Sequence, residues 1–182
     1  MAVNRGKKFE DVVRDCFEAT PDVSIDRLHD QTNGYKGSSN ICDFIVYREP
    51  LEYYFECKSV HGNTLSIYSI TKDPKHPHDY GNITNKQWEG LLEKSQINGV
   101  IAGVICWWVD HDATAFLPIR MLQDLRDAGY KSVNIRETDG WQQHYGREWN
   151  WHWLVGKKKR VFFDYDMKQL LDDIYFYERE WL

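Results

Sequence analysis

The chain has 182 residues, of which 42% are hydrophobic and 28% are charged, so it is long enough for one globular domain with a buried core. Its 23 basic and 28 acidic side chains give a net charge of −5, which excludes a strongly basic packaging protein but not a nucleic-acid enzyme with local basic patches. No apolar run reaches the roughly 18 residues of a membrane span, and the first residues lack the apolar segment of a secretory signal. We therefore expect an intracellular, cytoplasmic protein.

The first third of the chain predicts one helix followed by three strands. Residues 4–18 repeat apolar side chains at helical spacing, and residues 23–30 alternate as a strand does. Residues 32–40 are polar and glycine-containing, which predicts a loop. Two further strands are expected at 41–48 and 53–60, and they are close enough in sequence to form a hairpin.

The turn of this hairpin determines which side chains meet across it. Proline suits the first central position of a tight turn, so we expect the turn at Pro50-Leu51, with the numbers of paired residues adding up to about 101. In that register Asp43 lies directly opposite Lys58, and Glu56 lies one diagonal step from Asp43 on the same face. Two carboxylates and one ammonium group would therefore converge.

The rest of the chain alternates helices and strands. We expect an irregular segment at 61–83, a helix at 84–96, strands at 100–109 and 113–117, a helix at 118–128, a strand at 161–165 and a helix at 166–177. This order predicts one α/β domain with a mixed sheet, in which a parallel strand joins the hairpin after a crossover helix. Its core would span residues 4–130, with a C-terminal strand and helix as an extension over 131–182.

The four cysteines predict buried, reduced thiols. Cys16, Cys42, Cys57 and Cys106 form no CxxC pair, and each lies inside an apolar segment. A cysteine-based zinc site or a disulfide framework is therefore not expected.

The convergence on the hairpin has two interpretations. Two carboxylates at that separation suit a hard divalent cation, and a neighbouring lysine can orient a water molecule or stabilise charge on a phosphate. The alternative is a salt-bridged cluster on a solvated sheet face.

The motif also resembles a known family. Asp43, a gap of twelve residues and then Glu56-Cys57-Lys58 are similar to the signature of PD-(D/E)XK nucleases. Within that superfamily, residues 4–10 (Asn-Arg-Gly-Lys-Lys-Phe-Glu) resemble the opening motif of RecU-type Holliday junction resolvases. Residues 84–87 (Thr-Asn-Lys-Gln) and 157–177 resemble the glutamine helix and the C-terminal end of the same family.

The resemblance implies a restriction-endonuclease-like mixed sheet flanked by helices, forming a single nuclease domain over residues 1–182. It implies a Mg2+-dependent endonuclease, with Mn2+ as an alternative ion, that resolves Holliday junctions or other branched DNA in recombination and repair. Asp43 and Glu56 would be metal ligands, Lys58 the catalytic lysine, Gln87 a residue at the edge of the metal site and Glu10 an accessory acid. It further implies a homodimer in a bacterial or bacteriophage-infected cell.

Two of these residues also have a structural explanation. Thr84 and Gln87 have the spacing of a capping box, in which the glutamine binds the backbone of the cap residue. Glu10 lies at the rim of the apolar stripe of its helix, where an ordinary boundary carboxylate is common. Either role is compatible with the sequence.

Basic and aromatic side chains predict the contacts with DNA. The expected DNA-binding residues are Arg5, Lys7, Lys8, Tyr35, Lys36, Lys157, Lys158, Lys159 and Arg160. Tyr35 and Lys36 lie in the short segment that takes the place of the family's junction-reading stalk. Three tryptophans share one strand face and favour a core or dimer interface over base stacking: Trp149, Trp151 and Trp153. Three loop histidines could bind a metal, contact phosphate or stay solvated: His61, His76 and His78.

Two other functions compete with a junction resolvase. One is a DNA-binding recombination factor whose nuclease site is vestigial, and the other is a nuclease that acts on non-junction DNA. Because Asp43, Glu56 and Lys58 are all present, the sequence favours an active nuclease over a vestigial one.

Overall fold

The computed structural model describes residues 5–28, 40–67, 81–137 and 151–178. Its helices are α1 (Arg5–Glu18), α2 (Asn85–Lys94), α3 (Ile119–Asp127) and α5 (Met167–Glu178), with short 3₁₀ turns η1 (Val109–His111) and η2 (Ile135–Glu137). Its strands are β1 (Ser24–Arg27), β2 (Phe44–Arg48), β3 (Leu51–Val60), β4 (Thr64–Ser66), β5 (Val100–Trp108), β6 (Ala113–Pro118), β7 (Ser132–Asn134), β8 (His152–Trp153), β9 (Gly156–Lys159) and β10 (Phe162–Tyr165). No helix in these described ranges is long and apolar enough to cross a membrane.

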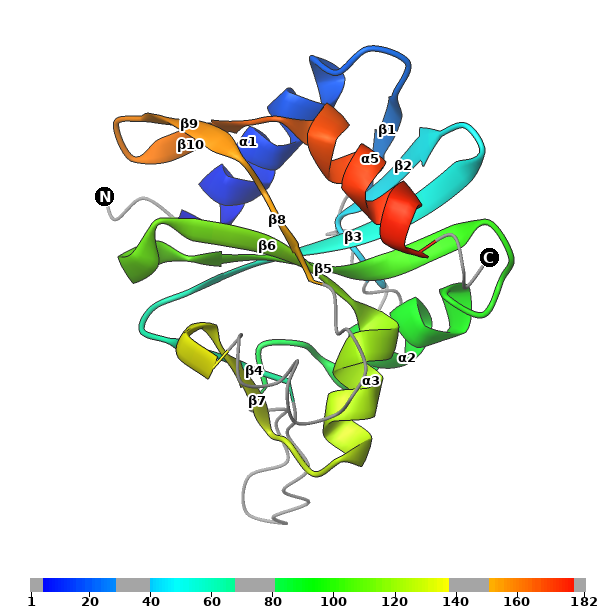
Figure 1. Cartoon of the computed structure of the whole chain (residues 1–182), viewed down its shortest axis with the longest axis vertical. Helices are drawn as coiled ribbons and strands as arrows, with labels where there is room; N and C mark the ends of the chain where they lie inside the picture. Colours follow the sequence, from blue (N-terminus) through cyan, green and yellow to red (C-terminus); the bar gives the residue numbers. More distant parts are fainter. Residues whose placement is uncertain (1–4, 29–39, 68–80, 138–150, 179–182) are drawn as a thin grey trace, which may run out of the picture.

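A six-stranded sheet forms the centre of the fold (Figure 1). Its strand order is β1-β2-β3-β5-β6-β8; β3 and β5 run parallel and the other neighbours antiparallel. The parallel pair is joined through α2, as expected for a crossover connection. The predicted mixed α/β sheet is confirmed.

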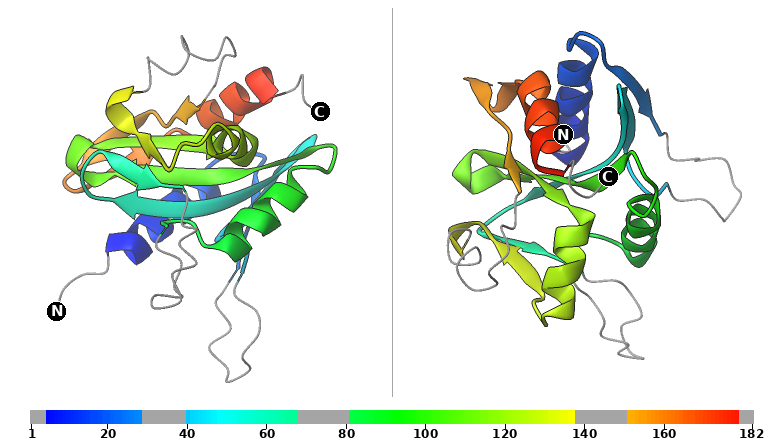
Figure 2. Two further views of the ribbon diagram at one scale, coloured as in Figure 1. Left: turned by 90° about the horizontal axis from the view of Figure 1, so that it is seen from below. Right: turned by 45° about the vertical axis from the view of Figure 1, so that its right-hand side comes forward.

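Helices cover both faces of this sheet, as the right-hand view of Figure 2 shows. On one face α1 and α5 pack against apolar side chains that include Phe44, Phe55 and Trp107. On the other face α2, α3 and the small β4–β7 sheet enclose a second core. β5 supplies side chains to both cores and is buried along its whole length, which explains its near-continuous apolar sequence.

The hairpin of β2 and β3 has a different register from the one that the sequence predicted. Phe44 pairs with Phe55, so the numbers of paired residues add up to 99 rather than 101. The turn lies at Glu49-Pro50, since Leu51 is buried and already belongs to β3. The peptide bond between Glu49 and Pro50 is cis. The expected turn at Pro50-Leu51 was therefore wrong by one residue.

This correction changes the partner of Asp43 but not the face on which it meets β3. Asp43 is not opposite Lys58: it lies one residue before Phe44, the first paired residue of β2, and its backbone N–H donates to the oxygen of Phe55 at 3.0 Å. A shift of two residues in an antiparallel pair keeps the same side chains on the same face. The carboxylate of Asp43 still meets β3 between Glu56 and Lys58, where its Oδ2 accepts from the backbone N–H of Cys57.

Short strands in the segments expected to be irregular or unclear were missed. β4 pairs with β7 in a separate two-stranded sheet, although residues 61–83 carried no strand signal. Three residues are too few for an alternating pattern to stand out from a loop.

The four cysteines are all buried and unpaired by disulfides, as predicted.

The β5–β6 pairing can be tested at Gly103. A side-chain carbon at this position would collide with the backbone oxygen of Leu117 and the ring of Phe116. Gly103→Ala should lower the free energy of unfolding by about 1–3 kcal/mol, the usual cost of overpacking a core. Urea denaturation measures this change, and an unchanged midpoint would contradict the observed approach of β5 and β6.

Candidate active site

The buried carboxylate of Glu56 lies at the centre of a polar cluster on β3. Glu56 is only 3% exposed, which is rare for an acidic residue without partners. The ammonium group of Lys58 lies 2.6 Å from Oε1, and the amide Nε2 of Gln87 donates to the same oxygen at 2.6 Å. Both contacts are made to Oε1 of the Glu56 carboxylate.

Lys58 comes from the same strand face as Glu56, because the two are two residues apart on β3. Its Nζ also donates to Oε1 of Gln87 at 3.2 Å. Lys58, Glu56 and Gln87 therefore form a closed triangle of charge-assisted hydrogen bonds, which holds the lysine in one orientation.

Gln87 forms the predicted capping box and also contacts the polar cluster on β3. Its backbone N–H donates to Oγ1 of Thr84 at 3.3 Å, and its Oε1 accepts from the N–H of Thr84 at 3.1 Å, which completes the capping box. The same side chain reaches Glu56 and Lys58 from the first turn of α2. The cap thus fixes the amide group that contacts the cluster.

Asp43 approaches from the residue directly before β2. Its Oδ2 accepts a hydrogen bond from the backbone N–H of Cys57 at 2.7 Å, so the carboxylate is anchored to the strand between Glu56 and Lys58. Asp43 also acts electrostatically on Glu56, since its negative charge contributes to raising the pKa of that residue. The structure therefore brings Asp43, Glu56 and Lys58 together, with Gln87 beside them.

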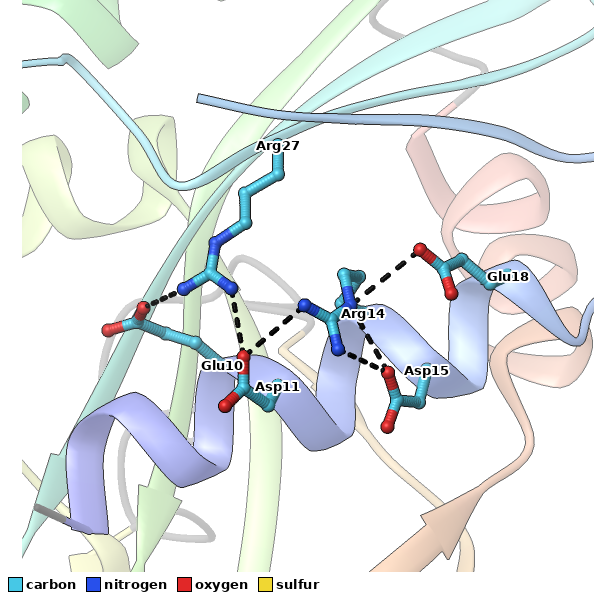
Figure 3. A network of polar contacts seen from close by, with 6 residues as sticks. All are labelled: Glu10, Asp11, Arg14, Asp15, Glu18 and Arg27. Carbon is cyan, nitrogen blue, oxygen red and sulfur yellow. Dashed lines mark hydrogen bonds and ion pairs between the residues drawn. The ribbon is translucent and has the colours of Figure 1, made fainter. Parts of the chain in front are cut away.

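Glu10 lies near this cluster but is held by an arginine that sequence reasoning missed. Arg27 of β1 forms an ion pair with Glu10 at 2.9 Å and another with Asp11 at 2.8 Å (Figure 3). Burial and the charge of Asp43 raise the pKa of Glu10, while Arg27 opposes them. Glu10 is thus close enough to Asp43 for that charge to raise its pKa, while its carboxylate is ion-paired with Arg27. No sequence pattern links β1 to α1, so this pair required the structure.

The cluster carries an excess of negative charge in a buried place. Burial first, and then the charge of Asp43, raise the pKa of Glu56 to about 7, although the ammonium of Lys58 opposes both. Such strong perturbation of a carboxyl group is typical of functional sites. A divalent cation would remove the repulsion between Asp43 and Glu56 that raises this pKa.

The donor set suits a hard cation. Asp43 and Glu56 offer carboxylate oxygens, whereas the nearby thiols of Cys42 and Cys57 are protonated. Burial raises the pKa of Cys42 to about 12 and the pKa of Cys57 well above its ordinary value. Magnesium is commonly bound through one or two carboxylates and keeps several waters. In the described part of the chain, no group of three or more His, Cys, Asp or Glu side chains could hold a metal. Asp43 and Glu56 are the two carboxylates that could hold one here.

The predicted DNA-binding residues are spread over two surfaces, and the structure describes seven of the nine. Arg5, Lys7 and Lys8 are exposed in the first turns of α1. The basic run at 157–160 is exposed on β9 and the following turn, where Lys158 forms an ion pair with Asp112 and Lys159 one with Asp164 at 2.6 Å. Tyr35 and Lys36 lie outside the described residues.

The tryptophans pack together next to the sheet edge. The rings of Trp151 and Trp153 lie 5.5 Å apart, and each lies 6.4 Å from the ring of Trp108. Trp151 packs against the core, while Trp153 keeps 41% of its surface exposed. Trp149, His76 and His78 lie outside the described residues, and His61 is exposed after the end of β3.

Comparisons with known proteins found a similar fold but no matching family model or curated protein. No protein-family model matches the sequence, and no curated protein matches it. Among solved structures, the fold is similar to that of Hjc, a Holliday junction resolvase from the archaeal hyperthermophile Archaeoglobus fulgidus, with 19% sequence identity and a TM-score of 0.42. The similarity covers 64% of this chain and 78% of that chain. A likeness of this size establishes neither family nor activity.

The raised pKa of Glu56 predicts a pH-dependent stability. The folded state holds the Glu56 proton more tightly than the unfolded chain, so the stabilising contribution is complete below about pH 4.5 and is lost as pH rises through about 7. Without divalent cations at pH 8, the free energy of unfolding of Glu56→Gln should therefore be about 1–3 kcal/mol higher than that of the parent. This difference should shrink towards pH 5.

Urea denaturation at both pH values, in EDTA, measures the effect. Glu52→Gln is the matched control on the same strand and should not reproduce it. If Glu56→Gln is less stable than the parent by the same amount at both pH values, Glu56 is a structural ion-pair partner, and burying its charge does not lower the stability of the parent.

Proposed function

We propose that the chain is a Mg2+-dependent endonuclease that hydrolyses phosphodiester bonds in DNA. The observation that carries this proposal is the convergence of Asp43, Glu56 and Lys58 on one sheet face, with Glu56 buried and strongly perturbed. Two carboxylates and a lysine meet the needs of phosphoryl chemistry, namely a site for a hard cation and a positive group at the reacting phosphate.

Asp43 and Glu56 would hold the cation, which when bound polarises a phosphate and increases the acidity of a water ligand. Lys58 would position the attacking water or stabilise the charge that develops on the phosphate oxygens. Gln87 would keep both Glu56 and Lys58 in place, because its amide donates to the carboxylate and accepts from the ammonium. Mn2+ would serve as an alternative cation, since it prefers the same oxygen ligands.

The resemblance to RecU-type resolvases supports branched DNA as the substrate. Residues 5–10 of the opening motif lie on α1, where Glu10 is close enough to Asp43 for that charge to raise its pKa. The glutamine at position 87 lies within the cluster. A nuclease acting on non-junction DNA uses the same chemistry and is the second candidate. A vestigial site is the third, but the hydrogen-bonded triangle of Glu56, Lys58 and Gln87 favours an active centre.

A homodimer is the assembly that paired cuts in a four-way junction would require. Exposed aromatic side chains at the end of α5 support such an interaction surface: Tyr175 is 45%, Phe176 56% and Tyr177 47% exposed. Apolar patches of this kind are often contact sites between proteins.

Substitutions in the cluster test the catalytic assignment. Asp43→Asn and Lys58→Gln should each lower the cleavage rate by about 100-fold or more, the usual effect of losing a charge at the reacting centre. Gln87→Ala should lower it by about 10–100-fold, as expected for a residue that orients a ligand. Cleavage of labelled DNA in Mg2+ measures all three, with melting curves as a check on folding.

Lys86→Gln provides the matched control, because Lys86 is exposed next to Gln87 and has no contact with the cluster among the described residues. It should cleave at the parent rate. Parent-like cleavage by Asp43→Asn would refute the assignment.

Substrate preference is tested by comparing a four-way junction with a linear duplex of the same sequence. The proposal expects faster cleavage of the junction and light scattering that reports a dimer at micromolar concentration. Equal cleavage of both substrates by a monomer would favour the non-junction nuclease instead.

A further inference from the structure

A chain of three polar side chains lies beyond the C-terminal end of β3, outside the cluster described above. Nη1 of Arg5 lies 3.4 Å from Nε2 of His61, and Nδ1 of the same histidine lies 3.0 Å from Oδ1 of Asp110. The other oxygen of Asp110 accepts from the backbone N–H of Gly62 at 2.7 Å. Three separate elements therefore meet here: α1, the turn after β3, and η1.

The hydrogen-bond partners determine which atoms donate and which accept among Arg5, His61 and Asp110. Two hydrogen bonds lower the pKa of Asp110, from the N–H of Gly62 and from the side chain of His61, so its carboxylate accepts from Nδ1–H of the histidine. Nε2 of His61 is then the acceptor that faces Arg5, since arginine carries only donors. The histidine thus orients the guanidinium group of Arg5 while using only part of its five N–H donors.

The Arg5–His61–Asp110 network lies just beyond the end of β3 at Val60. His61 follows Lys58 by three residues, which at about 3.3 Å per residue of extended chain amounts to ~10 Å. One phosphate occurs for about every 3.4 Å of helix axis on each DNA strand, so ~10 Å corresponds to roughly three steps. The first turn of α1 and the end of β5 lie at the same end of the sheet (Figure 1). Arg5 is exposed there, as a contact to a polyanion requires.

We infer that His61 and Asp110 position Arg5 to bind a backbone phosphate about three nucleotides from the scissile phosphate. This inference rests on the proposed function, because it assumes that DNA crosses the Asp43–Glu56 site. His61 and Asp110 are positioning residues, and Arg5 makes the contact. Holding a long arginine side chain before binding saves the entropy that ordering it would otherwise cost.

Binding of labelled duplex DNA in EDTA, measured over a series of salt concentrations at pH 8, tests the inference without cleavage. Arg5→Gln should weaken binding about tenfold at low salt and reduce the salt slope by about 1. His61→Leu should weaken binding about two- to tenfold, because Arg5 loses its support. His61→Gln should restore most of this loss, since its amide can accept from Arg5 and donate to Asp110.

The double variant Arg5→Gln/His61→Leu distinguishes positioning from an independent contact. It should bind no more weakly than Arg5→Gln alone, because His61 acts only through Arg5. Lys168→Gln is the charge control: Lys168 is exposed on α5 and pairs with Asp172, and its loss should leave binding at the parent level.

Two results would overturn the inference. Additive losses in the double variant would make His61 an independent contact, and parent-like binding by His61→Leu would remove its role altogether. If the parent cleaves DNA while either result holds, only this inference fails. A parent that neither binds nor cleaves DNA would refute the proposed function as well.

Discussion

The burial of the Glu56 carboxylate is the constraint on which the rest of the site depends. A carboxylate that is 3% exposed would simply stay protonated unless positive or hydrogen-bonding groups faced it. Lys58 and Gln87 supply those groups, and both direct their hydrogen bonds to the same oxygen. Asp43 works in the opposite direction, because its charge makes ionisation of Glu56 harder. This balance leaves a site that a divalent cation would stabilise.

The fold explains why these four residues meet although they are far apart in sequence. The β2–β3 hairpin brings Asp43 to the backbone of Cys57, and the alternation of β3 places Glu56 and Lys58 on one face. The crossover from β3 to the parallel strand β5 then carries α2 over that face, so its N-terminal turn delivers Gln87. The capping box of Thr84 and Gln87 starts α2 at Asn85, which places Gln87 in the first turn of the helix.

Much of this arrangement could be predicted from local sequence patterns, and the rest depended on contacts between distant segments. Alternation on 53–60 correctly placed Glu56 and Lys58 on a common face, and Thr84 with Gln87 correctly marked a helix start. The register at Asp43 was wrong because proline suits more than one position in a turn, and burial of Leu51 decided between them. Local sequence patterns do not predict contacts between distant segments, and two contacts near the site are of this kind: Glu10 with Arg27, and His61 with Asp110.

Binding of Mn2+ to the metal-free protein at pH 8, followed by the loss of the free-ion electron paramagnetic resonance signal, tests the central claim most directly. The parent and Lys86→Gln should bind the ion with the same affinity, and Asp43→Asn and Glu56→Gln should each bind it at least about tenfold more weakly. The parent should also bind more weakly at pH 6 than at pH 8, because Glu56 must lose its proton to act as a ligand. Undiminished binding by both carboxylate variants would contradict the claim that Asp43 and Glu56 form the cation site.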